Sequence, residues 1–142
     1  MDIKLSKHFS INECQHSDYA IKHGLENILP APCYKNALGL AINVLEPIRK
    51  QFGAFSPQSW FRSYEVNKGV GGSQTSDHII GAAADISIKG VDDMELARWI
   101  MANLMFKQLI VEPHWCHISY LEGDNRGQIL HKTRDGYAIG LK

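Results

Sequence analysis

Two short segments of this sequence, residues 76–86 and 115–119, place the strongest constraint on how the chain can fold. Between them they carry two imidazoles and one carboxylate: His78, Asp85 and His117. That set suits zinc, and a catalytic zinc site keeps its fourth position for water. A sharp turn at Gly81 could return the chain so that the first imidazole lies beside the carboxylate. On its own, a histidine seven residues before an aspartate more often marks a surface loop followed by an ordinary strand.

The alternation of side chains along a strand tests the second segment. In a strand that starts at residue 115, Trp115, His117 and Ser119 share one face, whereas Cys116 points the other way. Cys116 is therefore a poor metal ligand, and we expect it to be a small buried apolar side chain.

The residues before this strand place a further carboxylate near the site. If residues 113–114 form a two-residue hairpin loop, Glu112 lies opposite Trp115. Opposed residues share a face, so Glu112 would also lie on the side of His117. A loop of another length would reverse this parity, and proline does not suit the turns that two-residue hairpins prefer. The hairpin predicts a carboxylate near the metal but not bound to it.

A chain of 142 residues fits a single domain with one core, which we place at residues 1–142. Capping residues and apolar periodicity predict helices at 8–16, 17–24, 33–52 and 92–105, with a kink at Pro47 in the third. Alternating patterns and turn residues predict strands at 59–63, 83–88, 108–112 and 115–120, and a last hairpin at 128–132 and 137–141. The glycine-rich residues 64–77 predict a loop that shapes a cleft and delivers His78, or else a flexible surface loop.

Charge and hydropathy exclude several classes of partner. The formal net charge is zero and no basic stripe is concentrated anywhere, so nothing indicates nucleic acid as a partner. No apolar run is long enough to span a bilayer, and the N-terminal residues lack the apolar region of a signal peptide. We therefore expect synthesis in a cytoplasm and no membrane partner. The three cysteines follow no disulfide spacing, and reduced thiols are expected.

The combined motif resembles the zinc peptidases of bacterial cell walls. The residues that carry the resemblance are Ser76-x-His78-x-x-Gly81-x-Ala83-x-Asp85, followed downstream by Trp115-x-His117. That family comprises D-Ala-D-Ala carboxypeptidases and phage endolysin peptidases, and it shares its fold with the hedgehog signalling domain. Short runs at 61–63, 66–67, 70–73 and 125–128 are similar to the phage-type members. The resemblance covers about residues 5–140 and implies an α+β fold, with a small antiparallel sheet flanked by helices.

The resemblance also implies roles for individual residues. Zinc would be bound by His78, Asp85 and His117, and would lower the pKa of its water to about 7. Arg62 matches a substrate-contacting arginine of the family and could neutralise an oxyanion or a carboxylate of the peptide. Its alternative role is a surface salt bridge. Ser76 would either hydrogen-bond the substrate or order its own loop.

Two residues compete for proton transfer. Many relatives carry the catalytic acid three residues before the last histidine, and here that position is His114. Glu112 stands five before it and matches a glutamate of the phage-type members, so we favour Glu112 as the general base. His114 would then be a neighbouring or transition-state donor, or simply an exposed turn histidine.

With the resemblance, these residues predict an endolysin-type zinc peptidase. We expect a monomer that cleaves the stem peptides or cross-links of bacterial peptidoglycan. Without a signal peptide, it would wait in the host cytoplasm and reach the wall after holin-type or other release. The alternatives are a D,D-carboxypeptidase of wall maintenance and a zinc-containing but inactive binding module.

Overall fold

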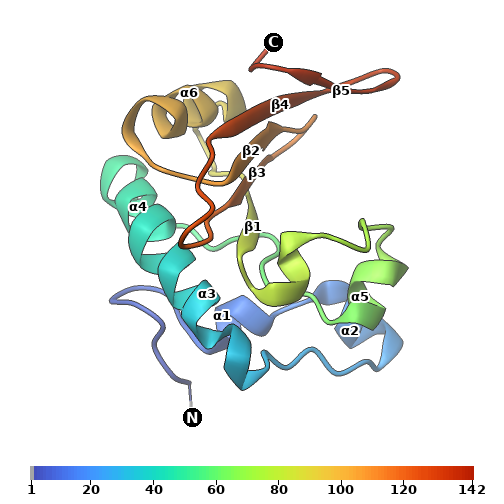
Figure 1. Cartoon of the computed structure of the whole chain (residues 1–142). Coiled ribbons are helices and arrows are strands. Elements are labelled where there is room, and N and C mark those ends of the chain that lie inside the picture. The colour runs from blue at the N-terminus through green and yellow to red at the C-terminus, as the bar shows by residue number, and fades with distance from the viewer. Residues whose placement is uncertain (1) are drawn as a thin grey trace.

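The computed structural model of this chain describes residues 2–142 and consists of a five-stranded sheet with helices packed beside and below it (Figure 1). The strands are β1 (Ala83–Ile86), β2 (Gln108–Val111), β3 (Cys116–Ser119), β4 (Gln128–Thr133) and β5 (Gly136–Ile139). They lie in the order β1-β3-β2-β4-β5 across the sheet. The α+β class expected from the sequence is confirmed.

The sheet is mixed rather than antiparallel throughout, because β4 runs parallel to β2 while the other pairs are antiparallel. After β3, residues 120–127 carry the chain back to the beginning of β2. There the Gly127 amide donates to the Phe106 carbonyl at 2.9 Å, and the Gln128 amide donates to the Lys107 carbonyl at 3.0 Å. A strand that enters beside the start of β2 must run in the same direction as β2. This pairing corrects the expectation of a wholly antiparallel sheet.

The register gives the sheet one polar face and one apolar face. Asp85 lies opposite His117, and on the other side of β3 His117 lies opposite Ile110. Directly opposed residues share a face. The intervening residues form the other face and are fully buried: Ala84, Ile86, Leu109, Cys116 and Ile118. Helix α6 (Asp93–Asn103) packs on β2 and β3, and its Asp93 carbonyl accepts from the Cys116 thiol, so Cys116 is a buried core residue as expected.

The other helices precede β1 and complete the core. They are α1 (Ile11–Gln15), α2 (Asp18–His23), η1 (Ala31–Cys33), α3 (Tyr34–Leu40), η2 (Ala41–Leu45), α4 (Glu46–Phe52), α5 (Tyr64–Gly69) and η3 (Asp77–Ile80). The predicted ends are confirmed where capping chemistry marks them. Ser10 and Glu13 form a reciprocal capping box at the start of α1, and Gly24 ends α2 in the left-handed conformation. No helix in residues 2–142 combines the length and apolar content needed to cross a bilayer.

The long helix expected at 33–52 forms as three consecutive segments, α3, η2 and α4. Pro47 has no amide hydrogen, and its ring would collide with a carbonyl one turn earlier in a regular α-helix. The chain accommodates it with a π-helical turn, η2, in which the Glu46 amide reaches the Ala41 carbonyl five residues back. The predicted kink therefore takes the form of a widened turn just before the proline.

Residues 59–69 differ from the sequence prediction. The strand expected at 59–63 is reduced to one bridge between Ser59 and Asp85. The next amides donate outside the sheet, from Phe61 to the Cys14 carbonyl and from Arg62 to the His78 carbonyl. Part of the expected loop is instead helix α5, which buries Val66 and Asn67.

Candidate metal centre

His78 is held in a tight turn from both of its ends. It lies in the 3-10 helix η3, where the Ser76 hydroxyl accepts from the His78 amide at 3.2 Å. Gly81 closes the turn with a φ of 75°, a conformation that side chains disfavour. Trp60 clasps the same turn: its carbonyl lies 2.6 Å from His78 Nδ1, and its indole donates to the Gly81 carbonyl at 3.0 Å. The His78 ring is therefore fixed and is only 2% exposed.

The other two predicted ligands face this ring from adjacent strands. Asp85 of β1 and His117 of β3 are directly opposed, so their side chains emerge on the same face. Asp85 Oδ1 lies 3.2 Å from His78 Nε2 and 3.1 Å from His117 Nδ1. One ligand atom from each of the three residues lies within 4.8 Å of the others. The structure thus brings together the three side chains that the sequence singled out.

The hydrogen bond to Trp60 tests whether this group suits a cation. A carbonyl can only accept, so His78 Nδ1 carries the hydrogen and a neutral ring presents the bare lone pair of Nε2. Burial lowers the pKa of His78 despite its contact with Asp85, which favours this neutral form. A nitrogen lone pair and a carboxylate oxygen then face each other, and a cation held by both relieves that opposition. Two imidazoles and one carboxylate match the ligands that zinc takes.

The far oxygen of Asp85 is held by Arg62. The guanidinium donates from Nη2 to Asp85 Oδ2 at 3.0 Å, and its other nitrogens donate to Ser59 at 3.0 Å and Asn67 at 3.3 Å. Arg62 is thus part of a largely buried ion pair rather than a surface salt bridge. Burial alone would raise the pKa of Asp85, but the hydrogen bond with His117 is the largest of the contacts that lower that pKa well below the ordinary range. Asp85 is therefore ionised and turned with Oδ1 towards both imidazoles.

The glycine-rich segment after α5 packs against Asn67, which hydrogen-bonds Arg62. Asn67 accepts from Arg62 and donates from its amide nitrogen to the Ser73 carbonyl at 2.8 Å. A Cβ at Gly72 would overlap the Asn67 side chain, so glycine allows the backbone to approach this closely. The segment is therefore tied to the metal group through Asn67 and Arg62.

The polar face of the sheet forms the floor of a cleft of about 690 Å³ that contains the three candidate ligands. The glycine-rich segment forms one side, with residues 70–73 and 75–77. Ile110 and Leu130 continue the row of Asp85 and His117 across the floor, because these residues are opposed from strand to strand. The group of His78, Asp85, His117 and Arg62, of which the first two are buried and the other two partly buried, is called the metal half below.

Glu112 and Tyr137 line the outer part of the cleft. Together with Lys132, whose ammonium contacts the Tyr137 ring, they are called the outer half below. The Glu112 amide donates to the Trp115 carbonyl at 2.9 Å, which confirms the two-residue hairpin. Glu112 therefore lies diagonally from His117 on the same face, a separation that long side chains can bridge. Its carboxylate accepts from the Tyr137 hydroxyl at 3.0 Å.

The predicted site residues do not all come together. Arg62, Ser76 and Glu112 line the cleft with the three candidate ligands, whereas His114 is exposed in the turn and does not line it. The Ser76 hydroxyl orders its loop by accepting from His78, which matches one of its two predicted roles.

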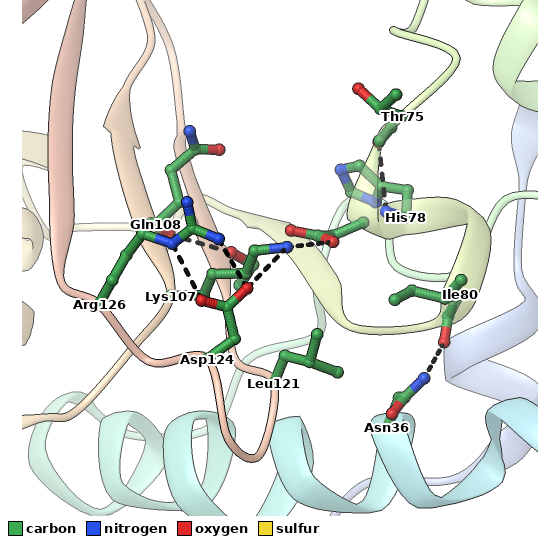
Figure 2. A network of polar contacts seen from close by, with 12 residues as sticks. Asn36, Thr75, His78, Ile80, Lys107, Gln108, Leu121, Asp124 and Arg126 are labelled. Atoms are coloured by element: carbon green, nitrogen blue, oxygen red, sulfur yellow. Dashed lines mark hydrogen bonds and ion pairs between the residues drawn. The ribbon is translucent and has the colours of Figure 1, made fainter.

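Several cleft residues were not found by sequence reasoning. Lys107 donates to Asp77 at 2.9 Å, and its ammonium lies 3.8 Å from the Asp124 carboxylate. Arg126 donates two hydrogen bonds to the same carboxylate, at 2.7 and 3.0 Å. Figure 2 shows the Asp124 carboxylate between the Arg126 guanidinium and the Lys107 ammonium. Tyr137 was likewise missed. The contacts of Asp124 and Arg126 depend on the path of residues 120–127, for which the sequence offered turn signals and one short run similar to phage-type members, but no pairing partner.

A family model described as Peptidase M15 matches residues 7–119, which include all three candidate ligands and Glu112. Comparison with curated proteins finds no match for this sequence.

Proposed function

The chain belongs to the peptidase M15 family, and we propose that it is a zinc-dependent peptidase that hydrolyses peptide bonds of bacterial peptidoglycan. Family membership suggests a metallopeptidase acting on peptidoglycan-like substrates. The observation that carries the proposal is the convergence of His78, Asp85 and His117 within 4.8 Å in an open cleft. When bound there, zinc supplies a Lewis acid and an acidified water.

In the metal half, hydrogen bonds already hold His78 and Asp85 in the orientations that a bound zinc ion would require. Trp60 fixes the tautomer of His78, and Arg62 fixes the face that Asp85 presents. Such neighbours of metal ligands typically change affinity or activity by about 10- to 100-fold when removed. Arg62 also lines the cleft, which supports its proposed contact with a carboxylate or a developing oxyanion of the substrate.

Proton transfer falls to Glu112. It lies in the cleft diagonally from His117, and a carboxylate can take a proton from the attacking water and deliver it to the leaving amine. His114 is exposed in the turn outside the cleft lining, so it is the weaker candidate for this step.

We assign the enzyme to the endolysin type, acting as a monomer on stem peptides or cross-links after release from the cytoplasm. The similarity of short runs such as residues 70–73 to phage-type members supports this assignment. The cleft is lined with amide and cationic groups, including Gln108, Gln128 and Arg126, which suit a peptide that carries carboxylates.

Digestion of purified peptidoglycan by the zinc-loaded protein tests the proposal. Mass spectrometry of the muropeptides should show new amino termini, and a Glu112→Gln variant should release about a thousandfold less per unit time. Glu122→Gln removes an exposed carboxylate outside the cleft and serves as the matched control.

Two other outcomes would replace the proposed activity. Release of free D-alanine from a pentapeptide, without larger fragments, would identify a D,D-carboxypeptidase. Stoichiometric zinc with no product from either substrate would identify an inactive binding module.

A further inference from the structure

The last hairpin adds a wall to the cleft that the family match does not include. Residues 128–139 lie beyond residues 7–119, yet they contribute Gln128, Leu130 and Tyr137 to the cleft lining. The pairing of β4 with β5 places Tyr137 opposite Lys132. Because β4 is parallel to β2, this row continues to Glu112, two residues after Ile110 on the same face.

The contact between Tyr137 and Glu112 joins the two ends of this row. The phenol donates to Glu112 Oε1 at 3.0 Å. Within residues 2–142, it is the one hydrogen bond that the Glu112 side chain makes. A carboxylate on a surface turn otherwise samples many rotamers, so this bond decides where its two oxygens point.

The tyrosine is held in turn by the hairpin. Lys132 Nζ lies 4.7 Å from the centroid of the Tyr137 ring, a cation–π contact, and the backbone of β5 is paired along β4. Although 53% of Tyr137 is exposed, its ring is therefore oriented before any ligand arrives. Burial and the bond and charge of Glu112, with a smaller effect of the Asp85 charge, raise the pKa of Tyr137, so the phenol remains a donor at neutral pH.

We propose that Tyr137 is a positioning residue that binds one oxygen of Glu112 and leaves the other oxygen directed at the attacking water. This inference rests on the proposed function, in which Glu112 is the general base. The hairpin thereby orients Glu112 through Tyr137, as Trp60 orients His78 and Arg62 orients Asp85.

Steady-state kinetics on a soluble muropeptide with the zinc-loaded protein tests the role. Tyr137→Phe keeps the ring and its contact with Lys132, and should lower kcat about tenfold with KM changed less than about twofold. Tyr64→Phe, which removes an exposed phenol outside the cleft, is the matched control. In a Glu112→Asp background, whose shorter carboxylate cannot reach the phenol, Tyr137→Phe should lower kcat no further.

A readout that does not need activity tests the contact itself. NMR titration of the Tyr137 ring carbon should give a lower phenol pKa in Glu112→Gln than in the wild type, since the bond and the charge of the carboxylate are both removed. Lys132 and Asp85 are the other charged groups around the ring, and both are unchanged in this comparison.

The results separate this inference from the proposed function. An inactive wild type whose Tyr137 titration still responds to Glu112→Gln would refute the peptidase and, with it, the positioning role, while keeping the contact. An active wild type in which Tyr137→Phe has normal kcat, or acts equally in the Glu112→Asp background, would refute the positioning role alone. A lower melting temperature with a raised KM in Tyr137→Phe would assign the residue to structure instead.

Discussion

The metal half and the outer half of the cleft are built on opposite plans. In the metal half each side chain is largely buried, and His78, Asp85 and Arg62 each have at least two polar partners; Arg62 alone donates to three different side chains. In the outer half Glu112 depends on a single bond from a half-exposed tyrosine. The geometry of the candidate ligands is therefore set by folding, whereas the orientation of Glu112, the proposed proton-transfer group, depends on one contact. Substitutions in the metal half should therefore cost stability, and substitutions in the outer half should cost rate.

Glu112→Gln, in the outer half, should have the largest effect on rate and almost none on stability. We expect kcat to fall about a thousandfold, because proton transfer by a positioned side chain contributes about 10²–10⁴. The unfolding free energy should change by less than about 0.5 kcal/mol, since a half-exposed side chain with one polar partner supports little packing. Kinetics and urea denaturation of the same preparations measure both quantities. A large loss of stability would break the contrast between the halves.

Asp85→Asn, in the metal half, should lower both the stability of the protein and its affinity for zinc. The substitution removes a candidate ligand and leaves the Arg62 guanidinium without its anion in a largely buried position. Breaking such a pair costs about 3 kcal/mol of stability, and zinc affinity should fall at least about 100-fold. Denaturation of the metal-free protein and zinc titration measure the two effects. Asp135→Asn, an exposed aspartate in the last hairpin, should change neither.

Gly72→Ala should damage the metal half without touching a ligand. The added methyl group would overlap the Asn67 side chain, which supports Arg62. Overpacking of this kind costs about 1–3 kcal/mol, and we expect zinc affinity to fall as well. Gly39→Ala is the control: it lies in α3, its Cβ would make only ordinary contact with Tyr120, and alanine favours helix. Equal stability of the two variants would contradict the proposed link through Asn67.

The last prediction concerns the pH dependence of the stability of the metal-free protein. The pKa of His78 is lower in the native state, chiefly because of burial, than its ordinary value of 6.5. The unfolded chain therefore takes up this proton first as pH falls. The contribution of His78 to stability is complete above pH 6.5 and declines below it, by up to about 1.4 kcal/mol per pH unit. Denaturation between pH 7 and 5 should show this slope in His114→Gln, whereas His78→Asn should flatten it.

The sequence predicted the features that depend on local chemistry. The alternation along Trp115–Ser119 predicted the face of His117, and the turn at Gly81 predicted that His78 lies beside Asp85. That all three side chains meet followed only from the family resemblance. Glu112 followed from the length of one hairpin loop.

The missed features depend on long-range pairing. Tyr137 reaches Glu112 only because β4 pairs with β2 in parallel, and no residue pattern announced the return of residues 120–127. Helix α5 was missed because its glycine and asparagine suggested a loop, whereas burial of Val66 stabilises it as a helix.

The carbonyl of Trp60 has a consequence for how this site can change over time. The bond that selects the tautomer of His78 comes from the main chain, so replacement of the side chain at position 60 leaves that acceptor in place. A substitution of Trp60 during evolution would remove the indole and its hydrogen bond to the Gly81 carbonyl. The tautomer of His78 would be retained as long as the bridge between Ser59 and Asp85 maintains the backbone path. The acceptor that selects the His78 tautomer is therefore maintained by the path of the backbone and not by the identity of residue 60.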